Sequence, residues 1–140
     1  METLKYKKLV PNAKLYEPAL VGDQGFDICS LFNYIILPGE SAEVFTGIAL
    51  QLPVGYYADV RTKSGLGFKG LQVHCGLIDE GYLGEVTLKI FNHSKETQYI
   101  GEEQKVAQIV LQRSNVLPLE EVQELVPTVR GNRCKGSTGK

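Results

Sequence analysis

The chain has 140 residues, of which 43% are hydrophobic and 22% are charged, and its formal net charge is −1. These values predict one globular domain with a substantial core, and they exclude an electrostatic basis for non-specific binding to nucleic acids or membrane surfaces. No stretch approaches the roughly 18 apolar residues of a membrane-spanning helix, and the first ten residues lack a secretory signal. The three cysteines are odd in number without metal-like spacing, so we expect free thiols in a cytoplasmic or nuclear protein.

Short apolar runs with a period of two follow one another along most of the chain, separated by turn residues. The segment 33–60 predicts three strands joined by a Pro-Gly-Glu turn and a Pro-Val-Gly turn. In the segment 85–92, Val86, Leu88 and Ile90 share one face, and the segment 105–113 repeats this alternation. Many short strands together with abundant glycine and proline predict an all-β fold, either a sandwich or a barrel.

The last part of the chain loses this pattern. The segment 118–126 fits a short helical turn and a polar strand equally well. The segment 130–140, RGNRCKGSTGK, is small, polar and glycine-rich, which is typical of a mobile terminus. We therefore expect one β domain over residues 1–128 and a flexible C-terminal arm over residues 129–140.

Five polar stretches carry residues that could form a site. In the first, residues 24–30, Asp27 lies between apolar neighbours, where a carboxylate is either a turn cap or the buried partner of an arginine. The second, residues 61–70, combines three basic residues with Ser64 and three glycines, which suits phosphate oxygens. A basic surface turn would have the same composition, and the glycine spacing of a Walker A loop is absent.

The third stretch, residues 73–92, sets Asp79 at the end of an apolar run and at the start of a hairpin-like turn. This aspartate is either turn punctuation or part of a site at a strand end. In the fourth, Gln108 follows Lys105 on a strand and by itself predicts only a polar strand residue. The fifth, residues 130–140, repeats the basic, hydroxyl and glycine chemistry of the second, which a disordered tail would also show.

Taken together and in this order, the five stretches resemble the motifs of the trimeric deoxyuridine triphosphatase (dUTPase) family. The matching segments are GFDICS, KSGLGFKG, GLIDEGYLGEV, QKVAQIV and RG…GSTG, within residues 24–139. The resemblance implies a jelly-roll-like β-sandwich or barrel of the β-clip type, in a homotrimer whose active sites combine segments of three subunits. It also implies Mg²⁺-assisted hydrolysis of dUTP to dUMP and pyrophosphate, which limits uracil entry into DNA and supplies dUMP.

The resemblance assigns roles at the nucleoside end of the substrate. Asp79 would orient the attacking water as general base and hold the 3′-hydroxyl side of the sugar, since an ionised carboxylate is a pure acceptor. Tyr82 would lie under the deoxyribose and leave no room for a 2′-hydroxyl. Main-chain groups of Gly76, Leu77 and Ile78 would hydrogen-bond the uracil edge, and a snug hairpin would exclude a C5 methyl group.

At the phosphate end, the resemblance implies contacts from the other four motifs. Asp27 would pair with an arginine of the closing tail or with water around the Mg²⁺ ion. That ion would be held mainly by phosphate oxygens and water, without a cage of protein carboxylates. The implied phosphate-binding residues are Lys63, Ser64, Gly65 and Gln108 of the domain and Arg130, Gly136, Ser137 and Thr138 of the arm.

Three departures from the family pattern stand out. Lys63 replaces the usual arginine, so it supplies a point charge without a bidentate fork. Glu103 replaces a common glycine. Residues 133–135 read Arg-Cys-Lys where the family usually has Gly-Gly-Phe, so Lys135 cannot stack a ring over the uracil. Losing that contact predicts a working but weakened lid, at a cost of about 1–3 kcal/mol.

Two other functions fit parts of the pattern. The related dCTP deaminases carry a catalytic glutamate ten residues after the aspartate position. Lys89 occupies that place here and cannot serve as a carboxylate base, which argues against deamination. A nucleotide-sensing or protein-binding module derived from a dUTPase is favoured by the altered fifth motif. The intact Asp79, Tyr82, Ser64 and Gln108 favour the enzyme.

Overall fold

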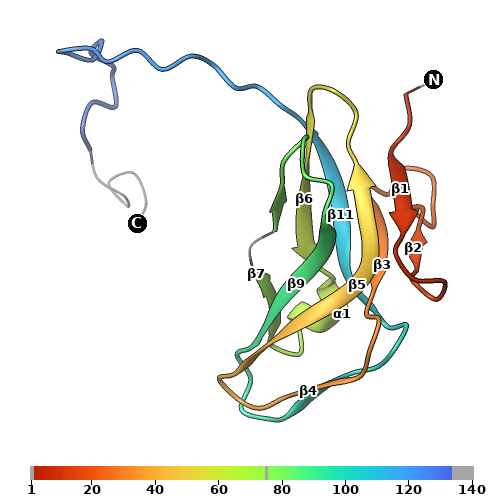
Figure 1. Ribbon diagram of the computed structural model, residues 1–140. Helices are drawn as coiled ribbons and strands as arrows, with labels where there is room; N and C mark the ends of the chain where they lie inside the picture. The colour runs from red at the N-terminus through yellow and green to blue at the C-terminus, as the bar shows by residue number, and fades with distance from the viewer. Residues whose placement is uncertain (1, 75, 134–140) are drawn as a thin grey trace.

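The computed structural model describes residues 2–74 and 76–133, which form layers of antiparallel strands and one short helix (Figure 1). The elements are β1 (Lys5–Lys8), β2 (Leu15–Tyr16), β3 (Gly25–Cys29), β4 (Tyr34–Ile36), β5 (Ser41–Gln51), β6 (Tyr56–Thr62), α1 (Ser64–Gly67), β7 (Leu71–His74), β8 (Leu77–Ile78), β9 (Glu85–Asn92), β10 (Gln98–Ile100) and β11 (Lys105–Arg113). Strands β4, β5 and β6 confirm the three strands predicted over residues 33–60.

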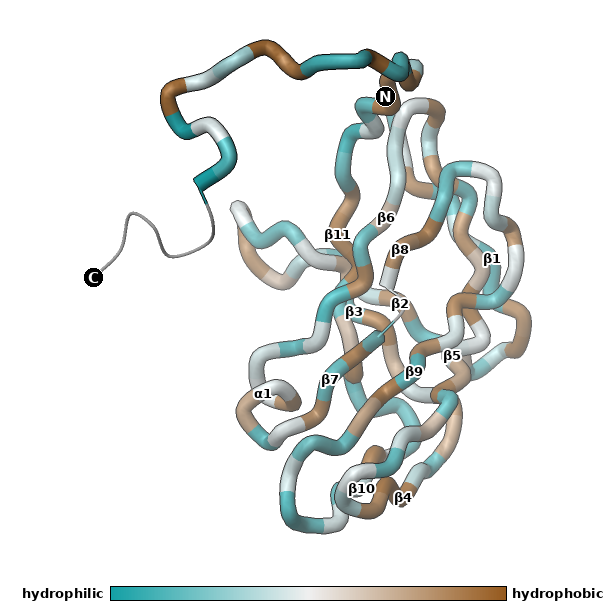
Figure 2. The backbone as a smooth tube through the Cα atoms, turned by 90° about the vertical axis from the view of Figure 1, so that its left-hand side faces the viewer, coloured by the Kyte–Doolittle hydropathy of each residue, from teal (hydrophilic) through white to brown (hydrophobic). Residues whose placement is uncertain are grey.

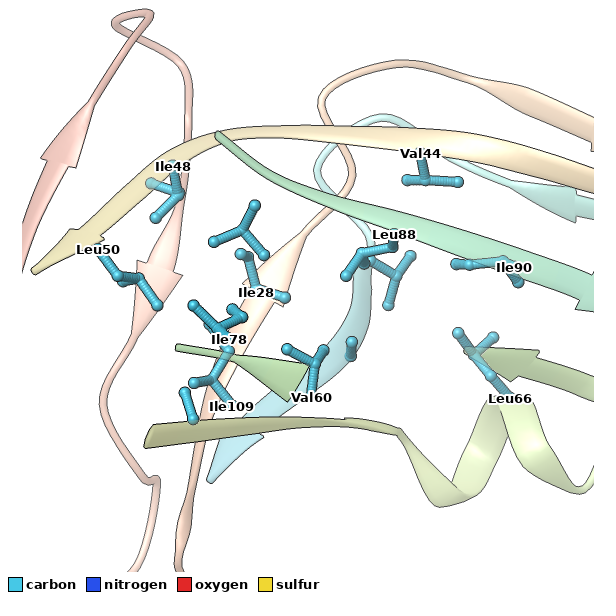
Figure 3. Close-up of a cluster of buried hydrophobic side chains, with 14 of the residues drawn as sticks. Ile28, Val44, Ile48, Leu50, Val60, Leu66, Ile78, Leu88, Ile90 and Ile109 are labelled. Carbon is cyan, nitrogen blue, oxygen red and sulfur yellow. The ribbon is translucent and has the colours of Figure 1, made fainter. Parts of the chain in front are cut away.

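Two sheets make up the body. One has the strand order β1-β5-β9-β7, and the other has the order β2-β3-β11-β6-β8. Strands β4 and β10 form a small separate sheet at the lower end of the body in Figure 1. The core fills the space between the sheets, where Ile28 and Ile109 from one sheet approach Val44 and Leu88 from the other (Figure 3). This arrangement confirms the predicted all-β, jelly-roll-like fold.

Strand β9 has the predicted alternation, with Val86, Leu88 and Ile90 buried and the residues between them exposed. Burying each such side chain stabilises the fold by about 1.5–3 kcal/mol relative to leaving it exposed. The strict alternation predicted for residues 105–113 is wrong at one point in β11, because Val106 and Ala107 are both buried.

The cause is a bulge next to Lys105. The pairing of β11 with β3 shifts its register between Lys105 and Ala107, so two successive side chains turn inward. The bulge lies next to Lys105, whose ammonium group pairs with Asp27 of β3 at 2.9 Å.

Both predictions for the segment 118–126 are wrong. No helix or strand forms between Ser114 and Arg133, and the chain leaves the body after β11 (Figures 1 and 2). An isolated short helix or strand is unstable without a surface on which to pack its apolar face. Seven apolar side chains between Ser114 and Arg133 are exposed: Val116, Leu117, Leu119, Val122, Leu125, Val126 and Val129.

Helix α1 is a single turn between β6 and β7, and Leu66 is its buried residue. Four residues are too few to show a helical period, so the sequence did not predict it. In the described part of the chain, no helix has the length and apolar character needed to cross a membrane. Cys29 is a buried free thiol whose pKa is raised by burial, and Cys75 and Cys134 lie outside the described residues.

Candidate active site

The segment between β8 and β9 forms a hairpin with a pocket of about 230 Å³ on its inner side. The turn begins at Asp79, where the Tyr82 N–H donates to the Asp79 carbonyl at 3.1 Å. Asp79 is exposed at this pocket. The structure therefore brings Leu77, Ile78, Asp79 and Tyr82 together, as predicted, and the complete lining is Val60, Leu77, Ile78, Asp79, Tyr82, Glu85, Val86 and Thr87.

Two glycines permit the tight packing of this hairpin. A Cβ at Gly76 would lie 2.4 Å from the Val60 carbonyl oxygen, so the backbones of β6 and the hairpin approach too closely for any side chain there. A Cβ at Gly84 would lie 2.6 Å from the hydroxyl of Tyr82. That hydroxyl donates to the Glu85 carbonyl at 2.9 Å, which holds the tyrosine ring against the hairpin.

Glu85, the first residue of β9, anchors the end of the hairpin to β5, the neighbouring strand of the same sheet. One oxygen of its carboxylate accepts hydrogen bonds from the amides of Gly47 at 2.7 Å and Thr46 at 3.2 Å, at the place where the pairing of β5 with β9 is interrupted. The Thr46 hydroxyl donates to the Val86 carbonyl at 2.6 Å. Sequence reasoning did not identify Glu85, although its place in GYLGEV could have suggested a role.

Strand β8 is the outermost strand of its sheet, so one side of its backbone is open. Ile78 stands opposite Ala58 and Leu77 opposite Asp59, and the Val60 N–H donates to the Gly76 carbonyl at 2.7 Å. In an antiparallel pair, alternate residues direct their main-chain groups to the partner strand. Leu77 therefore directs both its N–H and its C=O to the open side.

A second cluster, made of charged side chains, surrounds Asp27 of β3, in the same sheet as β8. Its two carboxylate oxygens pair with Lys63 at 2.5 Å and with Lys105 at 2.9 Å. Burial tends to raise the pKa of Asp27, but the hydrogen bonds and charges of the two lysines outweigh it, so the pKa lies below its usual value. The hydrogen bond to Asp27 raises the pKa of Lys105.

Among the described residues, the partners of Asp27 are thus two lysines from other segments, and its pairing with an arginine of a closing tail stays a prediction. Lys63 follows β6, and Lys105 is turned toward Asp27 at the β11 bulge. Lys105 also lies over the ring of Tyr16, 4.9 Å from its centroid. Sequence reasoning mentioned Lys105 only as a neighbour of Gln108.

Gln108 is the central residue of a row across the sheet, between Asp27 of β3 and Arg61 of β6. Its side chain lies over Gly25, where a Cβ would be 2.5 Å from its amide oxygen. Ser64 and Gly65 begin α1 beside Lys63, are exposed, and have open space around Gly65. The phosphate-binding residues predicted in the domain thus occupy neighbouring elements.

The two clusters do not meet within one chain. None of Asp27, Lys63, Ser64 and Gln108 lines the Asp79 pocket. Arg130 is exposed beyond the body, and Gly136, Ser137 and Thr138, like Lys135, lie outside the described residues.

Comparison with known proteins identifies this set of features. The model of the dUTPase family matches residues 11–139. The deoxyuridine 5′-triphosphate nucleotidohydrolase of Clostridium acetobutylicum is 42% identical over 99% of this chain and 98% of its own length, and that of Clostridioides difficile is 38% identical over 99% of both.

Solved structures agree with the sequence matches. A dUTPase of Staphylococcus bacteriophage 80alpha with dUpNHpp superimposes with a TM-score of 0.90 at 27% identity, covering 100% of both chains. A mutant dUTPase of phage phi11 of S. aureus, described with a structural Mg(II) ion, has a TM-score of 0.82 at 28% identity and covers 89% of this chain and 99% of its own. By full-length sequence match and by fold, this chain belongs to the dUTPase family.

Proposed function

We propose that this chain hydrolyses dUTP to dUMP and pyrophosphate by attack of water on the α-phosphorus. The observation that carries the proposal is the hairpin pocket, which combines an open strand edge, a fixed tyrosine and an exposed carboxylate. Family membership and the names of the curated relatives support the same activity.

Base recognition is assigned to the main chain of β8. The N–H donor and C=O acceptor of Leu77 match the carbonyl and N–H of the uracil edge, in the manner of a base partner. The Gly76 carbonyl already accepts from Val60, so the contribution of Gly76 is close approach of the backbone, and Ile78 closes the pocket floor. The Tyr82 ring, held through its hydroxyl, supports the deoxyribose and leaves no room for a 2′-hydroxyl.

Asp79 acts as general base. Its carboxylate accepts a proton from water as the oxygen attacks the α-phosphorus, and the bond to the bridging oxygen breaks to release pyrophosphate. Gln108, Ser64 and the amide of Gly65 bind phosphate oxygens. Lys63 and Lys105 bring two positive charges, of which Asp27 offsets one, so their cluster keeps a net charge that attracts the triphosphate.

The side chains of the described residues are compatible with a Mg²⁺ ion that is bound together with the substrate. Among the described residues, no three His, Cys, Asp or Glu side chains form a metal site, and Asp27 is engaged by its lysines. Mg²⁺ in such sites is held by substrate phosphates, with most other positions filled by water. When bound, it would stabilise negative charge on the phosphates, and the Asp27 carboxylate would accept hydrogen bonds from its water.

The complete site needs more than one subunit. Among the described residues, none of the predicted phosphate-binding side chains lines the Asp79 pocket of its own chain, and seven apolar residues after β11 are exposed. A homotrimer with shared sites accounts for both facts. In it, the domain over residues 1–128 supplies the pocket and the phosphate cluster, while the arm over residues 129–140 reaches a neighbour and places Arg130, Gly136, Ser137 and Thr138 on the γ-phosphate.

Pyrophosphate release from four nucleotides tests this function. We expect turnover of dUTP, with dTTP, dCTP and UTP hydrolysed at least about 100-fold more slowly, because a methyl group, an exchanged donor and acceptor, or a 2′-hydroxyl each conflicts with the pocket. Equal rates for dUTP and dTTP would contradict the assignment of the base to the hairpin.

A further inference from the structure

The turn that carries Asp79 is tied to the rest of the molecule through the next residue, Glu80. Among residues 2–74 and 76–133, no hydrogen bond or ion pair holds the Asp79 carboxylate, so the backbone around it sets its direction. The side chain of Glu80 makes the connection: its Oε2 accepts a hydrogen bond from the Gly55 N–H at 2.8 Å, between residues 25 positions apart.

Gly55 is well suited to this contact. It occupies the third position of the turn Pro53–Tyr56, which the Tyr56 N–H closes by donating to the Pro53 carbonyl at 3.2 Å. Its φ is +80°, as in a type II turn, and glycine adopts this value without strain. The turn therefore presents the Gly55 N–H to Glu80 in a fixed direction.

The same glycine also holds the start of the C-terminal segment. The Gly55 carbonyl accepts from the Ser114 N–H at 2.8 Å, and Ser114 is the first residue after β11. Beside this path lies a second hollow of about 420 Å³, bordered by Asp79 and Leu77 on one side and by residues 113–116 on the other. Through the N–H and the carbonyl of Gly55, the turn Pro53–Tyr56 thus connects Glu80 to Ser114, where the segment that leads into the arm begins.

We propose that Glu80 is a positioning residue for hydrolysis: its hydrogen bond to Gly55 fixes the turn that carries Asp79 relative to the pocket and to Ser114. This inference rests on the proposed role of Asp79 as general base. A hydrogen bond from a backbone N–H to a carboxylate is short and strong, so its loss frees the turn. A shift of about 1 Å in a catalytic group can lower turnover by about 100-fold.

Two substitutions at Glu80 separate the effect of its hydrogen bond to Gly55 from the effect of its negative charge. Glu80→Ala removes the acceptor, whereas Glu80→Gln keeps an amide oxygen at the same place. For the full-length protein we expect Glu80→Ala to lower kcat for dUTP by about 10- to 100-fold while KM changes by less than about three-fold. Glu80→Gln should retain most of the activity. Glu40→Ala, at an exposed turn glutamate preceding β5, is the control and should match the wild type.

A second readout is independent of activity. Hydrogen exchange of the Gly55 amide should be slow in the wild type and in Glu80→Gln, and faster in Glu80→Ala at unchanged Tm. Equal kcat for Glu80→Ala and Glu40→Ala, equal losses in both Glu80 variants, or unchanged exchange at Gly55 would each overturn the positioning role. An inactive wild type would instead overturn the function of Asp79 on which this role rests.

Discussion

Glu103 is the one described residue other than glycine with a positive φ, at 62°. A side chain in this left-handed conformation costs about 1 kcal/mol or more, which is the physical reason that a glycine is common at this place in the family. This chain has glutamate at this position, and its carboxylate forms an ion pair with Lys14 at 2.7 Å.

Glu103→Gly should therefore be more stable than Glu103→Gln, by up to about 1 kcal/mol. Both variants lose the ion pair, so their difference isolates the backbone conformation. Urea denaturation at one fixed protein concentration measures it. Equal stability of the two variants would show that the left-handed conformation carries no penalty here.

The lowered pKa of Asp27 predicts how the free energy of unfolding depends on pH. Its pKa is lowered in the folded state, so its contribution is present above its usual value of about 4 and is lost as the pH falls through the folded-state pKa. At pH 7, Asp27→Asn should cost about 1–2 kcal/mol, since it leaves Lys63 and Lys105 without a partner.

As the pH falls below about 4 and through the lowered folded-state pKa, the difference between wild type and Asp27→Asn should shrink, because the unfolded carboxyl group takes up a proton before the native one does. Urea denaturation at pH 7 and pH 3 compares the two proteins. Asp23→Asn is the matched control, because this exposed carboxylate accepts a main-chain hydrogen bond from Leu20 and forms no ion pair among the described residues. A difference that is constant with pH would contradict the pairing of Asp27 with the lysines.

At the scale of elements, the hairpin after β8 depends on backbone contact at Gly76. Gly76→Ala would place a methyl group 2.4 Å from the Val60 carbonyl, which forces the hairpin away from β6. We expect a loss of about 1–3 kcal/mol in stability together with most of the affinity for dUTP. Gly81→Ala is the control, because nothing lies within 4 Å of a Cβ there. Thermal unfolding and nucleotide titration of both variants check this, and equal behaviour would contradict it.

Elements with a regular pattern were predictable, and those set by tertiary contacts were not. Strands β5, β6 and β9 follow from the alternation of apolar residues. The β11 bulge did not, because the adjacent apolar residues Val106 and Ala107 fit a regular strand as well as a bulged one, and only the pairing with β3 shows the register shift. The segment 118–126 carries apolar residues without a surface to cover in its own chain, so neither predicted element forms.

The candidate site shows the same division. The residues of the Asp79 pocket are close in sequence, so a local motif could name them. The partners of Asp27 were missed because they come from the end of β6 and the β11 bulge, far apart in the chain. Glu80 and its bond to Gly55 were missed for the same reason.

For the whole molecule, the proposed trimer gives the segment after β11 a part in both assembly and catalysis. We expect deletion of residues 130–140 to leave the proposed trimer intact, because the exposed apolar residues between positions 116 and 129 remain, and to lower kcat/KM for dUTP by at least about 10-fold through the loss of the proposed γ-phosphate contacts. Size-exclusion chromatography and pyrophosphate release measure the two effects. A truncated chain that is monomeric, or fully active, would contradict this division of roles.

The Asp79 carboxylate in the hairpin pocket is proposed to activate the attacking water. The most direct test of this role is pyrophosphate release from saturating dUTP by the wild type and by Asp79→Asn, with dUTP binding measured in parallel. The amide keeps the shape of the side chain but is a poor base, so kcat should fall by about 100- to 10,000-fold with the fold preserved. If both proteins hydrolysed dUTP at the same rate, Asp79 would not be the general base, which would contradict the proposed mechanism.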